Sequence, residues 1–251
     1  MVVLGIESSS LHGGVALMGE AGLIAEYALN IDVTYSERLL PAIDRILADA
    51  GLAMSGVNGL AVAIGPGSFT GLRIGLSTAK GLAAASGIPL VGVPTLRARA
   101  WALPFACVPI CPILDARKGE VYCALFRWAG GNLEQVMEDT ALSPQTLAAR
   151  IAEPTLFVGD GMNVHGAFLA RTLGALALFA PPALAGARPA AVAALGRERL
   201  LRGERDDPAA LAPRYLRPSE AELKRAAATG TTGAAQPATG TTGAAQPATG
   251  N

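Results

Sequence analysis

The chain has 251 residues, and its twenty basic and twenty acidic residues give a formal net charge of zero at pH 7. A balanced charge argues against a surface devoted to polyanions, and the length leaves room for one large or two small domains around a buried core. The three cysteines do not have the spacing of a disulfide framework, and no export signal precedes the first apolar run. No unbroken apolar run is long enough to span a membrane. These features favour a cytoplasmic protein without membrane association.

The chain opens with three short apolar runs separated by polar turns, at residues 1–6, 15–18 and 23–29. This alternation predicts a three-stranded antiparallel meander. Further along, a continuous apolar run at 60–64 is typical of a buried parallel strand, and residues 89–93 predict another strand.

Two helices are predicted in the same part of the chain. Apolar residues recur at helical spacing over residues 36–50, but Pro41 would fit only near a first turn, which favours a later start for this helix. The second helix is predicted over residues 70–86, directly after a glycine-rich turn.

From residue 104 the opening pattern repeats. A strand is followed by a tight turn at 117–119 and by an alternating strand at 120–128. Two units that each begin with a strand, a polar turn and a second strand predict a duplicated α/β fold.

We therefore expect two related subdomains, residues 1–103 and 104–218, with an amphipathic helix at 190–202 able to pack back on the first. The remaining residues, 219–251, form a low-complexity tail. From Ala228 this tail repeats ATGTTGAAQP twice and begins a third copy. It has no apolar groups large enough to build a core, so we expect it to be disordered.

The glycine-rich turn, GPGSFTG, is followed by a helix with an unusual stripe of small residues. The turn lacks the lysine of a Walker A loop and the third glycine of a dinucleotide fingerprint. In the helix, small residues recur every four positions at Gly71, Gly75, Ala79 and Ala83. Glycine within a helix costs up to ~1 kcal/mol relative to alanine, so the stripe indicates a close approach, either by the chain's own sheet or by a partner helix.

Four segments together resemble a known family. They are SERLLPAID, GPGSFTGLRIGLSTAKGLA, LDARKGEVY and APRYLR, and in this order they are similar to the TsaB (YeaZ) family of tRNA threonylcarbamoyladenosine biosynthesis proteins. The resemblance covers residues 1–217. It implies an α/β fold of the actin, sugar kinase and Hsp70-like (ASKHA) class, built from two related subdomains.

The resemblance also implies a division of labour. The related TsaD subunit transfers the threonylcarbamoyl group to the adenosine beside the anticodon, whereas TsaB proteins are non-catalytic and support TsaD together with the ATPase TsaE. TsaB forms a homodimer, or a heterodimer with TsaD, through the same helical face. On this basis the chain would be no enzyme itself and would meet tRNA only indirectly.

The helical face of the resemblance can be placed on this sequence. It corresponds to the helices at 36–50 and 70–86. The residues expected to contact a partner are Leu39, Ile43, Ile46, Gly71, Arg73, Gly75, Ala79 and Ala83.

Fold relatives with catalytic activity bind a nucleotide between two polar turns, and this chain keeps part of that cleft. The candidate residues of a vestigial nucleotide cleft are Glu7, Ser8, Asp115, Arg117 and Gly159. Catalytic members use carboxylates there to position magnesium and water. Here Asp115 is followed by Ala-Arg-Lys-Gly rather than by a run of glycines that could wrap a phosphate.

The catalytic paralogue also has a metal-binding H-x-x-x-H motif after the strand at 89–93, where this chain has Thr95 and Arg99. We therefore expect no metal site and no resident cofactor, with ATP or ADP at the interface of the complex left open. Two alternatives remain: an ASKHA-type ATPase or phosphotransferase using Glu7 and Asp115, and direct tRNA binding, which the zero net charge opposes.

Overall fold

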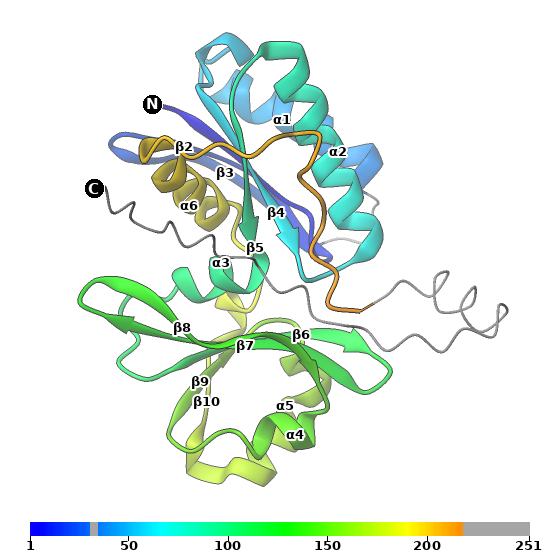
Figure 1. Ribbon diagram of the computed structural model, residues 1–251, viewed down its shortest axis with the longest axis vertical. Helices are drawn as coiled ribbons and strands as arrows, with labels where there is room; N and C mark the ends of the chain where they lie inside the picture. The colour runs from blue at the N-terminus through cyan, green and yellow to red at the C-terminus, as the bar shows by residue number, and fades with distance from the viewer. Residues whose placement is uncertain (31–34, 218–251) are drawn as a thin grey trace, which may run out of the picture. The chain divides into compact units, whose positions relative to one another are not determined.

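The computed structural model describes residues 1–30 and 35–217, and Met1–Arg217 form one compact unit (Figure 1). Two five-stranded mixed sheets build this unit. The low-complexity tail predicted at 219–251 lies outside the described residues. Within the described residues no helix is long and apolar enough to cross a membrane.

The first sheet contains the predicted meander. It has the order β3-β2-β1-β4-β5, with β1 antiparallel to β2, β2 antiparallel to β3, and β4 parallel to both β1 and β5. The bounds are β1 (Val3–Glu7), β2 (His12–Gly19), β3 (Gly22–Asn30), β4 (Gly59–Gly65) and β5 (Leu90–Pro94). The meander and the buried parallel strand are both confirmed.

Helices cover both faces of the first sheet. Helices α1 (Tyr35–Asp49) and α2 (Phe69–Ser86) pack with Leu4 and Ile6 of β1, while α6 (Pro189–Leu201) packs with Val3 and Gly5 on the opposite face (Figure 1). This arrangement follows from the strand geometry, because successive side chains point to opposite faces.

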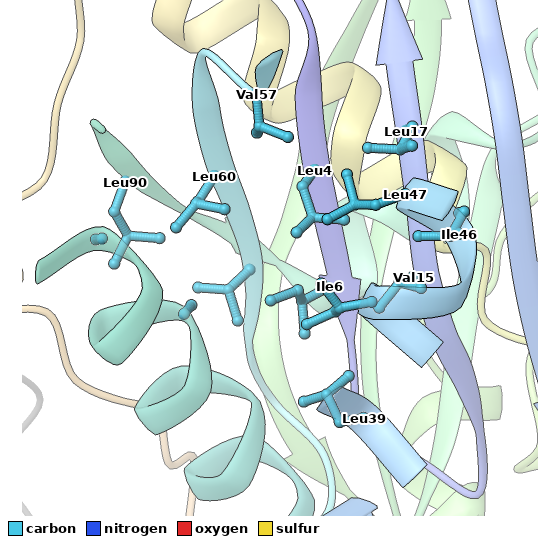
Figure 2. Close-up of a cluster of buried hydrophobic side chains, with 14 of the residues drawn as sticks. Leu4, Ile6, Val15, Leu17, Leu39, Ile46, Leu47, Val57, Leu60 and Leu90 are labelled. Carbon is cyan, nitrogen blue, oxygen red and sulfur yellow. The ribbon is translucent and has the colours of Figure 1, made fainter. Parts of the chain in front are cut away.

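Figure 2 shows the larger of these cores, in which β1, β2 and β4 contribute leucine, isoleucine and valine side chains between α1 and α2. Each fully buried aliphatic side chain of this kind contributes roughly 1.5–3 kcal/mol. The same burial explains why the expected later start of helix α1 is wrong. Helix α1 begins at Tyr35 and includes Pro41, rather than starting near the proline, because Tyr35 and Leu39 are both buried in the first turns.

The second sheet repeats the topology of the first. Its order is β8-β7-β6-β9-β10, an antiparallel meander followed by two parallel strands. The bounds are β6 (Ile110–Arg117), β7 (Glu120–Ala129), β8 (Asn132–Leu142), β9 (Thr155–Val158) and β10 (Ala177–Phe179). Helix α3 (Thr95–Trp101) packs on one face, and α4 (Pro144–Ala148) and α5 (Met162–Leu173) pack on the other. Short 3-10 helices occur at Met54–Gly56, Gly174–Leu176 and Pro182–Leu184.

After α6, residues 203–217 form a C-terminal segment that contacts both sheets. The Arg214 amide donates to the Ile64 carbonyl at the end of β4, over 2.6 Å. The Arg214 guanidinium lies 3.6 Å from the Asp139 carboxylate of β8, and that of Arg217 lies 3.3 Å from Glu120 of β7. The segment therefore links the two halves of the unit.

Candidate functional site

The turn between β1 and β2 is the most buried polar feature of the chain. Glu7, Ser8 and Ser9 each expose 1% or less of their surface. The Ser9 amide donates to the Glu7 carboxylate over 2.6 Å, and the Ser8 hydroxyl donates to the Gly71 carbonyl over 2.9 Å. The turn is thus fixed against the first turn of α2.

The small stripe of α2 faces this turn. A Cβ added at Gly71 would lie less than 3.0 Å from the Ser8 carbonyl oxygen, and one added at Gly75 would lie less than 3.0 Å from the Ser8 hydroxyl oxygen. Real Cβ atoms essentially never approach so closely. The glycines therefore let α2 pack directly on the turn. Ser68 caps the helix, because its Oγ accepts from the Gly71 amide over 3.2 Å.

This packing corrects the predicted partner contacts. Seven of the eight residues expected to touch a partner are buried within the chain: Leu39, Ile43, Ile46, Gly71, Gly75, Ala79 and Ala83. Only Arg73 is exposed, and its guanidinium stacks on the Phe69 ring and donates to the Tyr215 hydroxyl. Of the two possibilities for the stripe, packing within the chain holds, because the β1–β2 turn fills the space beside Gly71 and Gly75, and Ala79 and Ala83 belong to the buried core.

Arg99 places a cation at the same turn. It lies in the last turn of α3 and is only 3% exposed. Its Nη2 donates to the Ser10 hydroxyl over 3.1 Å, and its Nη1 donates to the Ala185 carbonyl over 2.9 Å. The guanidinium therefore ties the first turn to the segment before α6.

The charges around Glu7 follow from this arrangement. Burial raises the pKa of the Glu7 carboxyl, while the Arg99 guanidinium and hydrogen bonds from Ser9 oppose that rise. The negative charge of Asp160, on the turn after β9, adds to it. Burial also lowers the pKa of His12, again with a contribution from Arg99. Glu7, Arg99 and Asp160 thus form one electrostatic group drawn from both sheets.

The second polar turn is more open. The Asp115 side chain is 39% exposed, and its Oδ1 accepts from the Arg117 amide over 2.9 Å and lies 3.7 Å from the His165 Nε2. Arg117 is exposed and adopts a left-handed backbone conformation, with φ of 61°, in the tight turn to β7. The predicted turn at 117–119 is confirmed. It contains a single glycine, Gly119, rather than a run of glycines whose amides could wrap a phosphate.

Gly159 positions the turn after β9 against the second sheet. A Cβ at this residue would lie less than 3.0 Å from the Ile113 carbonyl oxygen, and the backbone has a φ of +123° that favours glycine. The Gly161 amide donates to the same carbonyl over 3.1 Å. The Gly159 turn therefore brings Asp160 toward the electrostatic group of the first turn.

These residues do not fit a bound magnesium ion. The carboxylate that would have to ligate it, Glu7, already faces the Arg99 cation, and Asp115 lies beside His165. No group of three or more His, Cys, Asp or Glu residues within 1–30 and 35–217 could hold a metal ion. Four buried polar atoms on or beside these turns lack a hydrogen-bond partner in the described part of the chain: Ser9 Oγ, Asp160 Oδ1, Arg99 Nε of α3 and His165 Nε2 of α5.

Sequence reasoning located both turns but missed some of their members. Ser9 and Ser10 stand beside the predicted Glu7 and Ser8, so the run of three serines was an available signal. The Ala185 carbonyl and the approach of Asp160 to Glu7 join residues far apart in the sequence, and no local pattern indicates them.

Comparison with known proteins gives consistent matches. Residues 28–225 match the family model described as TsaD, tRNA N6-adenosine threonylcarbamoyltransferase. The chain is 36% identical to the tRNA threonylcarbamoyladenosine biosynthesis protein TsaB of Bacillus subtilis, over 89% of this chain and 97% of that protein. It is 30% identical to TsaB of Haemophilus influenzae, over 73% of this chain and 82% of that protein.

A solved structure agrees with the sequence matches. YeaZ from Pseudomonas aeruginosa superposes with a TM-score of 0.72 at 26% identity, covering 86% of this chain and 99% of that one. Together with the repeated topology of the two sheets, these matches confirm the expected ASKHA-class α/β fold and the resemblance found in the sequence.

Proposed function

Because the chain belongs to the TsaB (YeaZ) family, we propose that it acts in the cytoplasm as a non-catalytic subunit for threonylcarbamoyladenosine modification of tRNA. A role in the biosynthesis of this nucleoside rests on the TsaB relatives, above all on the Bacillus subtilis protein that the chain matches over 97% of its length. The finer proposal is that it binds and supports a TsaD-type transferase, together with a TsaE-type ATPase.

The cleft supports a non-catalytic role. Arg99 is buried beside Glu7 and is held by Ser10 and Ala185. A fixed guanidinium in this position repels a metal cation and neutralises the carboxylate that a phosphoryl-transfer site would need for magnesium. On this proposal the chemistry takes place on the partner, and this chain contributes its fold and its surface.

The outer face of α1 and α2 is the surface that we propose for docking. It consists of exposed residues on the side of these helices away from the sheet: Leu40, Arg73, Ser77, Gly81 and Ala84. A Cβ at Gly81 would meet nothing within 4 Å, and Leu40 exposes 52% of its surface. Small residues at helical spacing beside an exposed leucine let a second pair of helices approach closely. A TsaD-type subunit, or a second copy of this chain, would occupy the same face.

An association measurement tests this surface. We expect Ala84→Leu to weaken binding to the cognate TsaD-type subunit at least about tenfold in titration calorimetry, because the larger side chain separates the helices. The matched control is Ala170→Leu, which makes the same change at an exposed position of α5 and should bind normally. Unchanged binding by Ala84→Leu would move the interface away from α1 and α2.

The alternative of an ATPase or phosphotransferase has one observation in its favour, the four unpartnered polar atoms on or beside the two polar turns. Buried polar atoms of this kind are normally satisfied by water or a ligand. Magnesium-dependent binding of ATP or ADP that Asp115→Ala abolishes would favour this alternative. Binding that appears only in the complex with the partner would instead place the nucleotide at the interface.

A further inference from the structure

A cavity of about 600 Å³ lies apart from the polar turns described above. Residues of β5, α3, α6 and the β7–β8 hairpin line it. The only two tryptophans of the chain, Trp101 and Trp128, are both in this lining, with Val93 and Leu195 among the apolar residues beside them. The volume falls within the range of roughly 300–1,000 Å³ that is usual for small-molecule sites.

One of the tryptophans has an unused hydrogen-bond donor. The indole Nε1 of Trp128 is buried, and no residue in the described ranges accepts its hydrogen. Buried tryptophan N–H groups normally have an acceptor, since leaving the group unpaired is unfavourable. Trp128 lines the cavity, but its N–H is buried, so an acceptor bound there would reach this donor only after a shift of the indole.

The same cavity has a cation without a matching carboxylate. Arg97 of α3 is half-buried; its Nη2 donates to the Leu133 carbonyl over 2.9 Å, and among the described residues no carboxylate forms an ion pair with it. The other two arginines of the lining differ. Arg199 is paired with Asp206 at 2.9 Å, and Arg202 is paired with Glu204 at 2.7 Å. The unpaired positive charge is thus that of Arg97.

The combination of these features selects a class of ligand. Two aromatic side chains stack well on a planar ring, and a guanidinium without a carboxylate partner suits a phosphate. The exposed carboxylate of Glu198, also in the lining, can accept from an exocyclic amino group but would repel a ligand that is anionic throughout. An acidic peptide satisfies the donors but provides no ring for the tryptophans.

We propose that this cavity binds a nucleotide unit, with the base against Trp101 or Trp128 and the phosphate on Arg97. The unit is either a free nucleotide or an unpaired nucleotide of an RNA. The proposal does not rest on the proposed function, because it uses only the lining of the cavity. It also differs from the cleft at Glu7 and Asp115, whose residues take no part in this lining.

Tryptophan fluorescence tests the proposal directly, because both tryptophans report on this cavity. The full chain is titrated with each ribonucleoside monophosphate, with a short unpaired oligoribonucleotide and with inorganic phosphate, using excitation at the red edge of the tryptophan band. We expect saturable quenching by a monophosphate, which indicates a free nucleotide, or by the oligoribonucleotide alone, which indicates RNA. No saturable response to either, or an equal response to inorganic phosphate, would overturn the proposal.

Variants locate the site. Arg97→Gln removes the charge and keeps a polar side chain, so we expect the dissociation constant to rise at least about tenfold. Arg205→Gln, at an exposed arginine outside the lining, should leave it unchanged. Trp128→Phe replaces the indole by a smaller ring with less stacking area, and should also weaken binding. Loss of binding in Asp115→Ala with normal binding in Arg97→Gln would assign the ligand to the other cleft and refute the proposal.

Discussion

Replacing Gly75 by alanine tests whether the small stripe of α2 packs on the β1–β2 turn. The new Cβ would lie less than 3.0 Å from the Ser8 hydroxyl oxygen and 3.1 Å from the Ser8 Cβ. Ser8 is fully buried, and its hydroxyl donates to the Gly71 carbonyl, so it has no free space into which to move. The substitution therefore forces a shift of the turn or of the helix.

The magnitude can be worked from these contacts. Overpacking of a tight core costs about 1–3 kcal/mol, and loss of the Ser8 hydrogen bond costs about 1 kcal/mol more. The better helix propensity of alanine offsets about 1 kcal/mol of this destabilisation. We expect Gly75→Ala to lower the free energy of unfolding by about 1–3 kcal/mol.

Gly81→Ala is the matched control, because it makes the same change in the same helix where a Cβ meets nothing within 4 Å. This variant should be more stable than the parent by up to about 1 kcal/mol. Urea unfolding followed by far-UV circular dichroism measures both variants. If Gly75→Ala were as stable as Gly81→Ala, the stripe would not be in contact with the turn, and the outward orientation first considered for it would regain support.

Three further outcomes follow from the structure. The folded-state pKa of Glu7 is raised, so the stability of the parent relative to Glu7→Gln should fall as the pH rises above 4.5, the ordinary pKa of a glutamate carboxyl, measured by urea unfolding at several pH values. Arg214→Ala leaves the carboxylate of Asp139, whose side chain is 3% exposed, without its cation, and should lower the free energy of unfolding by about 1 kcal/mol or more. Cys107 is exposed whereas the other two cysteines are buried with raised pKa values, so a thiol reagent should modify one cysteine in the native protein and three after unfolding.

Most of the elements could be predicted, because the strands are short apolar runs bounded by polar turns and the longer helices carry apolar residues at helical spacing. The start of α1 was wrong, since the local preference of Pro41 for a first turn is weaker than the burial of Tyr35 and Leu39. Local propensity decides such boundaries only where packing does not.

The orientation of α2 could not be read from its sequence. The helix has two small faces, one with Gly71 and Gly75 and another with Ser77 and Gly81, and the same spacing suits a helix partner or a buried turn. Only the position of Ser8 in space decides between them. The polar turn at Glu7 was predictable because it follows a buried strand directly.

The central claim is that the chain is required for threonylcarbamoyl transfer without performing it. The most direct measurement is transfer to tRNA by the cognate TsaD-type and TsaE-type subunits, supplied with threonylcarbamoyl-adenylate, with and without this chain. We expect modified tRNA only when the chain is present, and none from the chain alone. Full product without the chain would contradict the claim and direct attention to the cleft at Glu7 and Asp115.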